Sequence, residues 1–207
     1  GRLQRRVFLF RDCARLVNQD RNIFGACMVA CGDADGMVTG VTRPFAVAYS
    51  EVSRVIDAKE GECPMGITIM MAQEKTIFIA DSRIHELPTS EELAEIACGG
   101  ANYARKIGQE PRVAFLSFSN FGQPKRSQME RVRKAVSLLD ERKVDFEYDG
   151  EMNVDTALDF NLMQRLYPFC RLSGPANVLV MPELHSSSIS SKLLQALGDG
   201  TVIGPVL

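Results

Sequence analysis

TSEELAEIACGGANYARKIGQEPRVAFLSF, residues 89–118, contains a helix start, a helix end and a buried strand in succession. Thr89 and Glu92 have the spacing of a capping box, in which each side chain bonds the backbone amide of the other residue. Apolar residues follow at helical spacing until Gly108, a residue type that commonly ends helices. Residues 113–118 then form a mostly apolar run, typical of strands that a parallel sheet buries on both faces. The stretch predicts a helix followed by a strand of such a sheet.

The same alternation continues toward the end of the chain. The spacing predicts helices over 125–142, 152–165 and 187–197, and strands over 144–148 and 177–181. Helices and strands that alternate in this way indicate an α/β fold, a parallel sheet with helices on both faces. Ligands in such folds bind outside the carboxyl ends of the strands.

The region before residue 89 has a different pattern. Helical spacing predicts a helix over 3–31, and a second, shorter helix fits residues 51–59. Residues 36–40 resemble a short strand, and the apolar runs 67–71 and 76–80, separated by a polar turn, predict paired strands. Pro88 is the best candidate for a boundary between domains, which would divide the chain into 1–88 and 89–207.

Composition and charge exclude several classes of protein. The chain has 207 residues, of which 45% are hydrophobic and 24% charged, as in ordinary globular domains. A formal net charge of −2 lacks the basic excess that a nucleic-acid binder shows. Its apolar runs are shorter than the roughly 20 residues that cross a bilayer, and no signal peptide is visible. We therefore expect no nucleic-acid partner, no membrane and a cytoplasmic protein. Because the chain lacks an initiator Met and stops on apolar residues, we expect a piece of a longer protein.

The cysteines and histidines do not indicate a metal site. The chain has six cysteines and two histidines, His85 and His185, and none of them forms the two short clusters that a zinc site needs. Scattered thiols are typical of the reducing cytoplasm. The sequence predicts no metal ligand.

Polar residues at the predicted strand ends are the candidates for binding. Residues 186–191 place five hydroxyls at a helix start, where free amides favour an anion, although a serine-rich cap explains the same pattern. Asp149, Glu151 and Asp155 would suit acid or base chemistry, and they equally suit a turn before a helix. The side chains that we expect to face a ligand are Ser117, Ser119, Asn120, Glu151, Asp155, Asn177, His185, Ser186 and Ser188.

Several segments resemble the phosphate acetyltransferase family. They are Ala34–Gly40, Phe78–Asp81, Pro88 with Glu92–Ala97, Pro111–Ser117, Asp149–Glu151 with Asp155, and Ala176–Pro182. A narrower group is more similar still, the phosphotransacetylase-like C-terminal domain of bacterial NADP-dependent malic enzymes. The segments that resemble this group are Asn18–Asn22, Val55–Lys59, Ser117–Gly122 and Tyr167–Asn177.

The resemblance implies a fold and partners. It implies a three-layer α/β/α unit with a mostly parallel sheet and two lobes, as in isocitrate and isopropylmalate dehydrogenases. It implies acetyl-CoA or a related acyl-CoA as effector, with Arg43 and Lys192 as the cations for its phosphates. It further implies assembly into a homodimer or a higher homo-oligomer. The catalytic domain of the same parent chain, which converts malate to pyruvate, would lie upstream and hold the NADP and the divalent metal. We expect no cofactor in the present chain.

The sequence departs from active transacetylases where cations are needed. Ser119–Gln123 replaces Ser-Thr-Lys-Gly-Ser, so that Phe121 stands at the position of a lysine, and Ser50-Glu51 replaces Arg-Pro. The resemblance places the family's catalytic Ser and Arg in a stretch that follows Leu207. Because phosphoryl and acyl transfer needs preorganised donors and cations, we expect a regulatory, acyl-CoA-binding and oligomerising domain with no catalytic residue. The alternatives are an active phosphate acetyltransferase and a structural oligomerisation domain that binds nothing.

Overall fold

The computed structural model of the protein describes residues 9–59, 63–72, 74–81, 83–124 and 127–207. Its internal contacts divide the chain into two compact units, residues 1–61 and 62–207. Pro88, the boundary that the sequence predicts, is buried inside the second unit. The strands that precede Pro88 lie in the same sheet as those that follow it. Residues 1–88 therefore do not form a compact unit of their own.

Three helices make up the described part of the first unit: α2 (Phe10–Gln19), α3 (Arg21–Cys31) and α4 (Phe45–Val52). Ile23, Ala26 and Val55 form its buried core. Gly32 ends α3 in the left-handed conformation, which agrees with the predicted helix stop. The predicted strand over 36–40 is wrong, because these residues form no regular structure. The predicted helix over 51–59 is also wrong, because α4 begins after Pro44 and ends at Val52.

Two aspartates break helices that the sequence predicts as continuous. In the helix predicted over 3–31, whose first residues lie outside the described part, Asp20 adopts an extended conformation between α2 and α3. Its carboxylate accepts hydrogen bonds from the amides of Asn22 and Ile23, at 2.9 and 3.0 Å. In the same way, Asp159 caps α8 by accepting from the amide of Leu162 at 3.0 Å. A capped start satisfies amides that a helix leaves free, so each aspartate begins a new helix.

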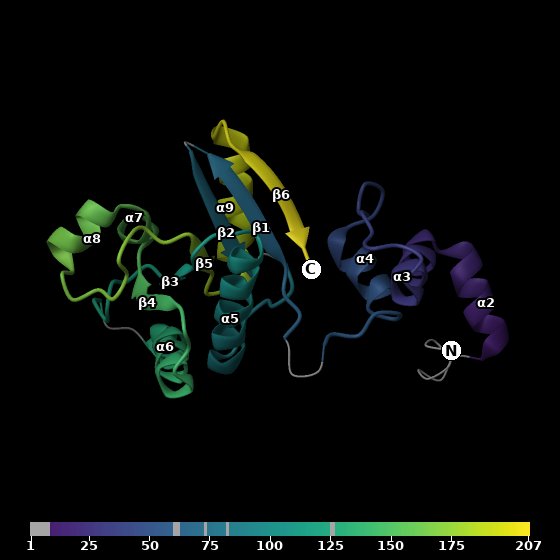
Figure 1. Cartoon of the computed structure of the whole chain (residues 1–207), viewed down its shortest axis with the longest axis horizontal. Helices are drawn as coiled ribbons and strands as arrows, with labels where there is room; N and C mark the ends of the chain where they lie inside the picture. The colour runs from purple at the N-terminus through teal and green to yellow at the C-terminus, as the bar shows by residue number, and fades with distance from the viewer. Residues whose placement is uncertain (1–8, 60–62, 73, 82, 125–126) are drawn as a thin grey trace. The chain divides into compact units, whose positions relative to one another are not determined.

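The second unit is built on one six-stranded sheet (Figure 1). In space the strands follow the order β4 (Glu147–Met152), β3 (Arg112–Leu116), β5 (Val178–Val180), β2 (Lys75–Ala80), β1 (Ile67–Ala72) and β6 (Thr201–Val206). The pairs β4–β3, β3–β5 and β5–β2 are parallel, and the pairs of β1 with β2 and with β6 are antiparallel. The α/β class and the paired strands near residue 70 are confirmed, while the sheet is mixed.

The helices of this unit are α5 (Ser90–Lys106), α6 (Glu130–Arg142), α7 (Val154–Leu158), α8 (Phe160–Leu166) and α9 (Leu184–Leu197), with a short 3-10 turn, η1 (Ser127–Met129), before α6. Figure 1 shows α6 and α7 on opposite sides of β3 and β4. The capping box predicted at the start of α5 is confirmed: the amide of Glu92 donates to Thr89 Oγ1 at 3.2 Å, and the amide of Thr89 donates to the Glu92 carboxylate at 2.7 Å.

Alternate residues of the central strands pack against different helices. Val113 and Phe115 of β3 lie in a core with the apolar faces of α5 and α6. Ala114 and Leu116 lie in a second core that includes Ala157 of α7 and residues of α8. This alternation is the period of two that a strand imposes on its side chains. The sheet is therefore buried on both faces near β3, which leaves the strand ends as the place where polar groups collect.

Candidate functional site

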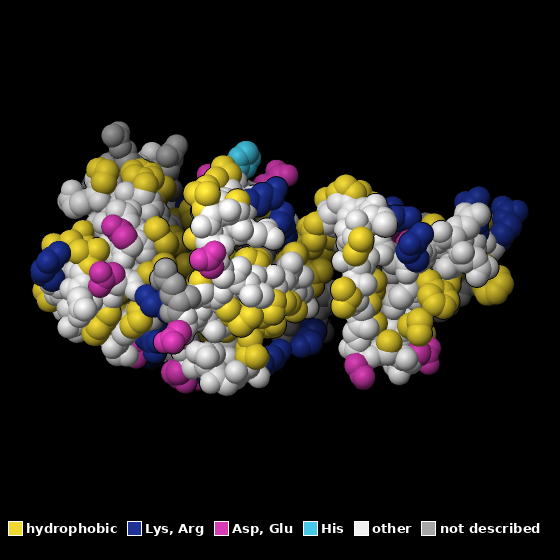
Figure 2. Space-filling model, turned by 90° about the horizontal axis from the view of Figure 1, so that it is seen from above, with side chains coloured by type: hydrophobic (Ala, Val, Ile, Leu, Met, Phe, Trp, Pro, Cys, Tyr) yellow, Lys and Arg dark blue, Asp and Glu magenta, His cyan; other side chains and the backbone are white. Residues whose placement is uncertain are grey.

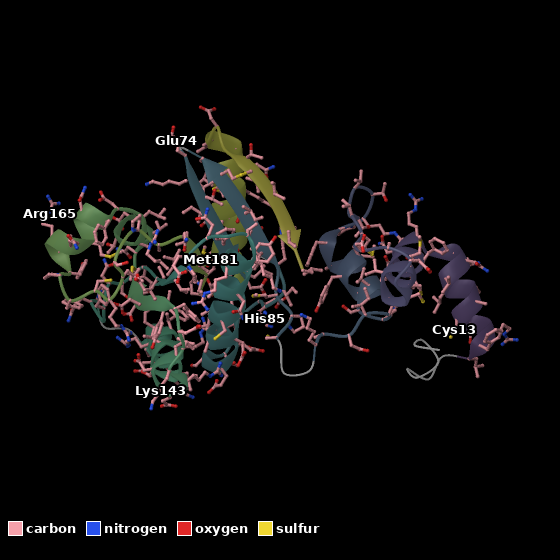
Figure 3. All side chains as sticks on the ribbon, viewed as in Figure 1. Cys13, Glu74, His85, Lys143, Arg165 and Met181 are labelled. Atoms are coloured by element: carbon pink, nitrogen blue, oxygen red, sulfur yellow. The ribbon has the colours of Figure 1, made fainter. Side chains whose placement is uncertain are left out.

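A cavity of about 910 Å³ lies at the carboxyl ends of three neighbouring strands. The segments that follow β3, β4 and β5 each contribute to it, and the labelled Met181 marks it in Figure 3. The lining residues are Leu87, Leu116, Ser117, Phe118, Ser127, Met129, Arg131, Asn153, Val154, Asp155, Met181, Pro182, Glu183 and Ser186. This is the edge of the sheet at which the α/β rule predicts a ligand site.

Three of the residues predicted to face a ligand line this cavity: Ser117, Asp155 and Ser186. The hydroxyl of Ser186 donates to the carbonyl of Glu183 at 2.8 Å, and Asp155 Oδ1 accepts from the amide of Thr156 at 2.8 Å. Ser117 Oγ lies 3.1 Å from Ser119 Oγ. The Ser117 hydroxyl also donates to Met129 Sδ and accepts from the amide of Ser119 at 3.1 Å, so the fold already uses it. Ser186 and Asp155 keep hydrogen-bonding capacity beyond their contacts, since a hydroxyl has two lone pairs and a carboxylate about four acceptor positions.

Glu151 and Ser119 lie behind the cavity wall and are fully buried. Glu151 Oε1 accepts from Ser119 Oγ at 3.1 Å and from the amide of Gly122 at 2.8 Å, and it lies 3.8 Å from a guanidinium nitrogen of Arg133. Glu151 Oε2 is buried with no hydrogen-bond partner among the described residues. These contacts tie the loop that follows β3 to β4, so both side chains position the wall of the site rather than form its surface.

Asn120 and Phe121 shape the turn of this loop. Asn120 Oδ1 accepts from the amide of Asn153 at 2.8 Å, and the backbone of Asn120 pairs with that of Gln123. Phe121 has a φ of 48° and packs against Tyr167 and Phe169, with ring centroids 5.1 and 5.0 Å apart. Phe121, which the resemblance matches to a lysine of the family, therefore belongs to an aromatic cluster.

The structure places Asn177 at the amino end of β5, away from the cavity. Its Oδ1 accepts from the amide of Arg112 at 2.7 Å, and its Nδ2 donates to the carbonyl of Glu110 at 2.8 Å. Both bonds join β5 to the segment that leads into β3. Asn177 thus connects two strands at the edge of the sheet opposite the site.

Four further candidates lie outside the cavity lining. His185 and Lys192 are exposed on α9, and Ser188 is half-buried on the same helix. Arg43 belongs to the first unit, where it forms ion pairs with Asp20, at 2.5 Å, and with Glu51. The hydrogen bond that Arg43 donates to the Asp20 carboxylate is the main cause that raises the pKa of Arg43. Arg43 is thus already engaged with two carboxylates.

Arg131 lines the cavity as a cation, and the sequence did not lead us to predict it. Its guanidinium donates to the backbone carbonyls of Pro88 and Pro182, at 2.8 and 3.0 Å. A guanidinium carries five N–H donors in a fixed plane, so two bonds to rigid backbone leave an oriented cation with donors to spare. The signal was available: Arg131 lies in the first turn of the helix that follows β3, next to the expected site.

The charge of the cavity lining is mixed. Arg131 stands against two carboxylates, Asp155 and Glu183, and the other lining residues are uncharged. On the face drawn in Figure 2, the described Lys and Arg side chains of the second unit lie in separate small groups, with acidic side chains among them. Among the residues that the structure describes, Arg131 is the cation that the lining offers to a ligand.

The described residues contain no group of three or more His, Cys, Asp or Glu side chains placed to hold a metal ion. None of the helices in the described part of the chain combines the length and the apolar character that a membrane span needs.

The sequence matches the family model described as phosphate acetyl/butaryl transferase over residues 1–207. It is 57% identical over 207 residues to the NADP-dependent malic enzyme of Rhizobium meliloti (strain 1021), covering 100% of this chain and 27% of that protein. It is 37% identical over 195 residues to the phosphate acetyltransferase of Bacillus subtilis (strain 168), covering 94% of this chain and 60% of that protein. The structure is similar to that of EutD phosphotransacetylase from Staphylococcus aureus, with a TM-score of 0.79 and 34% sequence identity over 89% of this chain and 58% of that one.

The chain thus spans about a quarter of the malic enzyme and about three fifths of the two transacetylases. The predicted resemblance to both groups is confirmed, as is the likeness of the fold to solved phosphotransacetylases. The chain belongs to the phosphate acetyl/butaryl transferase family.

Proposed function

We propose that the chain is a regulatory domain that binds an acyl-CoA, acetyl-CoA first among them, at the carboxyl ends of β3, β4 and β5. In this proposal it is part of an NADP-dependent malic enzyme whose catalytic domain, with its NADP and divalent metal, is a separate part of the parent protein. The cavity lining is the observation that carries the proposal, because its described residues place an oriented cation, Arg131, among mostly apolar and hydroxyl-bearing side chains.

Such a lining suits binding. A volume of about 910 Å³ falls within the roughly 300–1,000 Å³ that ligand pockets occupy. Leu116, Phe118 and Met181 offer apolar contact to the acyl group and the adjoining chain of the ligand. Ser186 offers the lone pairs of its hydroxyl to the ligand's amides. Arg131 suits a phosphate because its planar fork donates two parallel hydrogen bonds.

The same lining suits catalysis poorly. Acyl transfer to phosphate brings a multiply charged group into the site, where Asp155 and Glu183 oppose it. Loss of one preorganised donor typically slows a reaction by about 10²–10³. Phe121, at the position of a family lysine, packs against aromatic rings. We therefore expect binding without turnover.

Oligomerisation is the second part of the proposal. Ile189, Leu193 and Leu197 of α9 are exposed apolar side chains, with 64%, 55% and 79% of their surface accessible. Apolar groups gathered on one helix commonly mark a protein–protein contact. We include in the proposal a homodimer or higher homo-oligomer, a cytoplasmic location, and the three-layer, two-lobed architecture of the isocitrate dehydrogenase type for the complete domain.

The test is a calorimetric titration of the protein with acetyl-CoA, followed by an assay of the same sample for thiol release in the presence of phosphate. We expect saturable binding and no turnover. Arg131→Gln should weaken binding at least tenfold. The matched control is Arg142→Gln, on the same helix, where the arginine forms an ion pair with Glu95 at 2.7 Å and does not line the cavity.

Each alternative predicts a different result. Thiol release that depends on phosphate would overturn the proposal in favour of an active phosphate acetyltransferase. If the folded protein binds no acetyl-CoA, the result favours a structural domain whose function is oligomerisation.

A further inference from the structure

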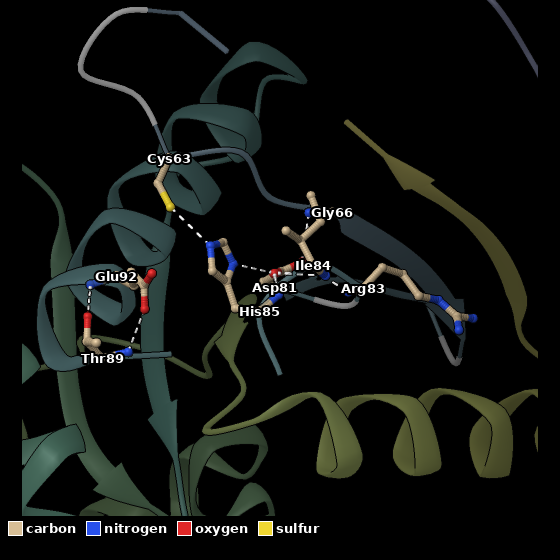
Figure 4. Close-up of polar contacts among 8 residues, drawn as sticks. All are labelled: Cys63, Gly66, Asp81, Arg83, Ile84, His85, Thr89 and Glu92. Carbon is tan, nitrogen blue, oxygen red and sulfur yellow. Dashed lines mark hydrogen bonds and ion pairs between the residues drawn. The ribbon is translucent and has the colours of Figure 1, made fainter. Parts of the chain in front are cut away.

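Cys63, His85 and Asp81 form a connected group outside the cavity lining (Figure 4). Cys63 precedes β1, whereas Asp81 and His85 follow β2, so that the β1–β2 hairpin brings them together. Cys63 Sγ lies 3.3 Å from His85 Nε2, and His85 Nδ1 lies 2.7 Å from Asp81 Oδ2. Figure 3 labels His85 as well.

Asp81 is held rigidly by the backbone. Its carboxylate accepts from the amides of Gly66, Arg83, Ile84 and His85, at 2.8, 3.0, 3.1 and 2.8 Å. Burial by itself would raise the pKa of Asp81, but the bonds from His85 and from these amides outweigh it and hold the pKa below its ordinary value. Asp81 is therefore an ionised acceptor in a fixed orientation.

Asp81 in turn fixes the orientation of His85. An ionised carboxylate only accepts hydrogen bonds, so His85 carries its proton on Nδ1 and presents Nε2 to Cys63. The hydrogen bond to Asp81 is the main cause that raises the pKa of His85, and the nearby Glu92 adds to it. His85 Nε2 is consequently a stronger base than an isolated imidazole.

The thiol of Cys63 is kept protonated at rest. Partial burial is the main cause that raises its pKa, and the carboxylates of Glu92, Asp81 and Glu95 raise it further. Oxidation and disulfide exchange start from a thiolate, so this environment disfavours them. It favours a reaction in which a neighbouring base removes the proton as the sulfur attacks. A nucleophile, a base and a group that orients the base are the arrangement that such a reaction needs.

We propose that Cys63 is a nucleophilic thiol that accepts an acyl group from an activated acyl donor, with His85 as general base and Asp81 as positioning residue. The donor is an acyl thioester or an acyl phosphate, which share an electrophilic carbonyl carbon. Cys63 Sγ forms a bond to this carbon while its proton passes to His85 Nε2. The bond to the leaving thiolate or phosphate breaks, and the leaving group takes the proton from His85. The product is a thioester on Cys63, formed without any oxidant or reductant.

The experiment measures S-acetylation residue by residue. The protein is incubated with acetyl phosphate in one arm and with the acetyl thioester of N-acetylcysteamine in the other, then quenched in acid and mapped by peptide mass spectrometry. Cys98 is the internal control, because burial is likewise the main cause that raises its pKa and its side-chain hydrogen bond is with Arg142. We expect Cys63 to be acetylated at least ten times faster than Cys98.

His85→Gln tests the base, since a glutamine can still donate to Asp81. General base catalysis typically contributes about 10²–10⁴ in rate, so acetylation of Cys63 should fall by about 10² while that of Cys98 stays unchanged. Asp81→Asn should shift the pH profile of Cys63 acetylation to lower pH, because His85 loses the charge that raises its pKa. The position of the pH profile does not depend on how much of the sample is folded, so this shift tests the proposal even if His85→Gln folds poorly.

The outcomes separate clearly. Labelling by only one of the two donors supports the proposal and identifies the donor. Equal rates at Cys63 and Cys98, labelling by neither donor, or an unchanged rate in a folded His85→Gln variant would each overturn it. The proposal does not rest on acyl-CoA binding at the cavity, because the arm with acetyl phosphate contains no CoA.

Discussion

The carboxyl ends of β3, β4 and β5 leave Asp155, Ser186 and Arg131 at the surface of a cavity, whereas at the opposite edge of the sheet the side-chain amide of Asn177 is bonded to two backbone groups. Both edges carry polar side chains that look alike in the sequence. They differ in how many hydrogen-bonding positions the fold leaves open. A side chain with open positions next to a cavity is available to a ligand, and one with none stabilises the fold.

Asn177→Ala tests this difference with the largest expected effect. The substitution removes the partner of the amide of Arg112, a half-buried residue, and of the carbonyl of Glu110, an exposed residue. A group left without its hydrogen-bond partner away from water costs about 1–3 kcal/mol, so we expect the free energy of unfolding to fall by about 1–3 kcal/mol, measured by urea denaturation. Acetyl-CoA affinity of the folded variant should not change.

Asn102→Ala is the matched control for this substitution, because Asn102 is exposed on α5. It should change the free energy of unfolding by less than about 0.5 kcal/mol. If Asn177→Ala lowers the free energy of unfolding as little as Asn102→Ala does, the hydrogen bonds of Asn177 do not stabilise the sheet.

The carboxyl end of β2 sharpens the comparison, since there Asp81 is saturated with backbone bonds as Asn177 is. The pKa of Asp81 lies below its ordinary value of 3.8, so its contribution to stability is present above about pH 4 and is lost as pH falls through the folded pKa. The pKa of His85 lies above 6.5, so its contribution is present below that pH and is lost as pH rises through the folded pKa.

We therefore expect the stability difference between the protein and Asp81→Asn to be largest between about pH 4 and pH 6.5 and to shrink on both sides. The groups that face this pair are Cys63 and Glu92. Urea denaturation at a series of pH values measures the difference. A difference that does not vary with pH would contradict the charged Asp81–His85 pair.

Local signals predicted the parts of the fold that lie close together in sequence. The capping box of Thr89 and Glu92 and the apolar run of β3 specify their own conformation, and both are confirmed. The hairpin of β1 and β2 is confirmed for the same reason. Elements that depend on distant partners were not predicted: β6, only partly buried, is defined by its pairing with β1.

The helix breaks at Asp20 and Asp159 were missed because apolar residues keep helical spacing on both sides of each break. At Asp20 the helix is broken by one carboxylate that accepts from two backbone amides. The spacing of apolar residues carries no information about such a bond. For the site, the rule about strand ends located the cavity through Ser117, Asp155 and Ser186. It could not separate Ser119, which faces Glu151 behind the wall, from Ser117 two residues earlier.

Glu183→Gln tests the electrostatic side of the cavity with a smaller effect. Glu183 lines the cavity, and its side chain makes no capping bond at the start of α9. Removing one exposed negative charge typically changes a charge interaction by about 0.2–1 kcal/mol, so acetyl-CoA should bind about two to five times more tightly at low salt. The gain should fade at high salt because screening weakens it. An unchanged affinity at low salt would place the phosphates of the ligand away from α9.

Ser186→Ala should have the smallest effect on stability, although Ser186 bonds the backbone at the start of α9. Its hydroxyl bonds the carbonyl of Glu183 at 2.8 Å at a half-exposed position, where water replaces a lost partner. We expect a change in the free energy of unfolding within about 0.5 kcal/mol and a measurable loss of acetyl-CoA affinity. A large loss of stability would instead make Ser186 a structural residue like Asn177. The carboxyl edge would then differ from the amino edge only by the presence of a cavity, and Arg131 alone would carry recognition there.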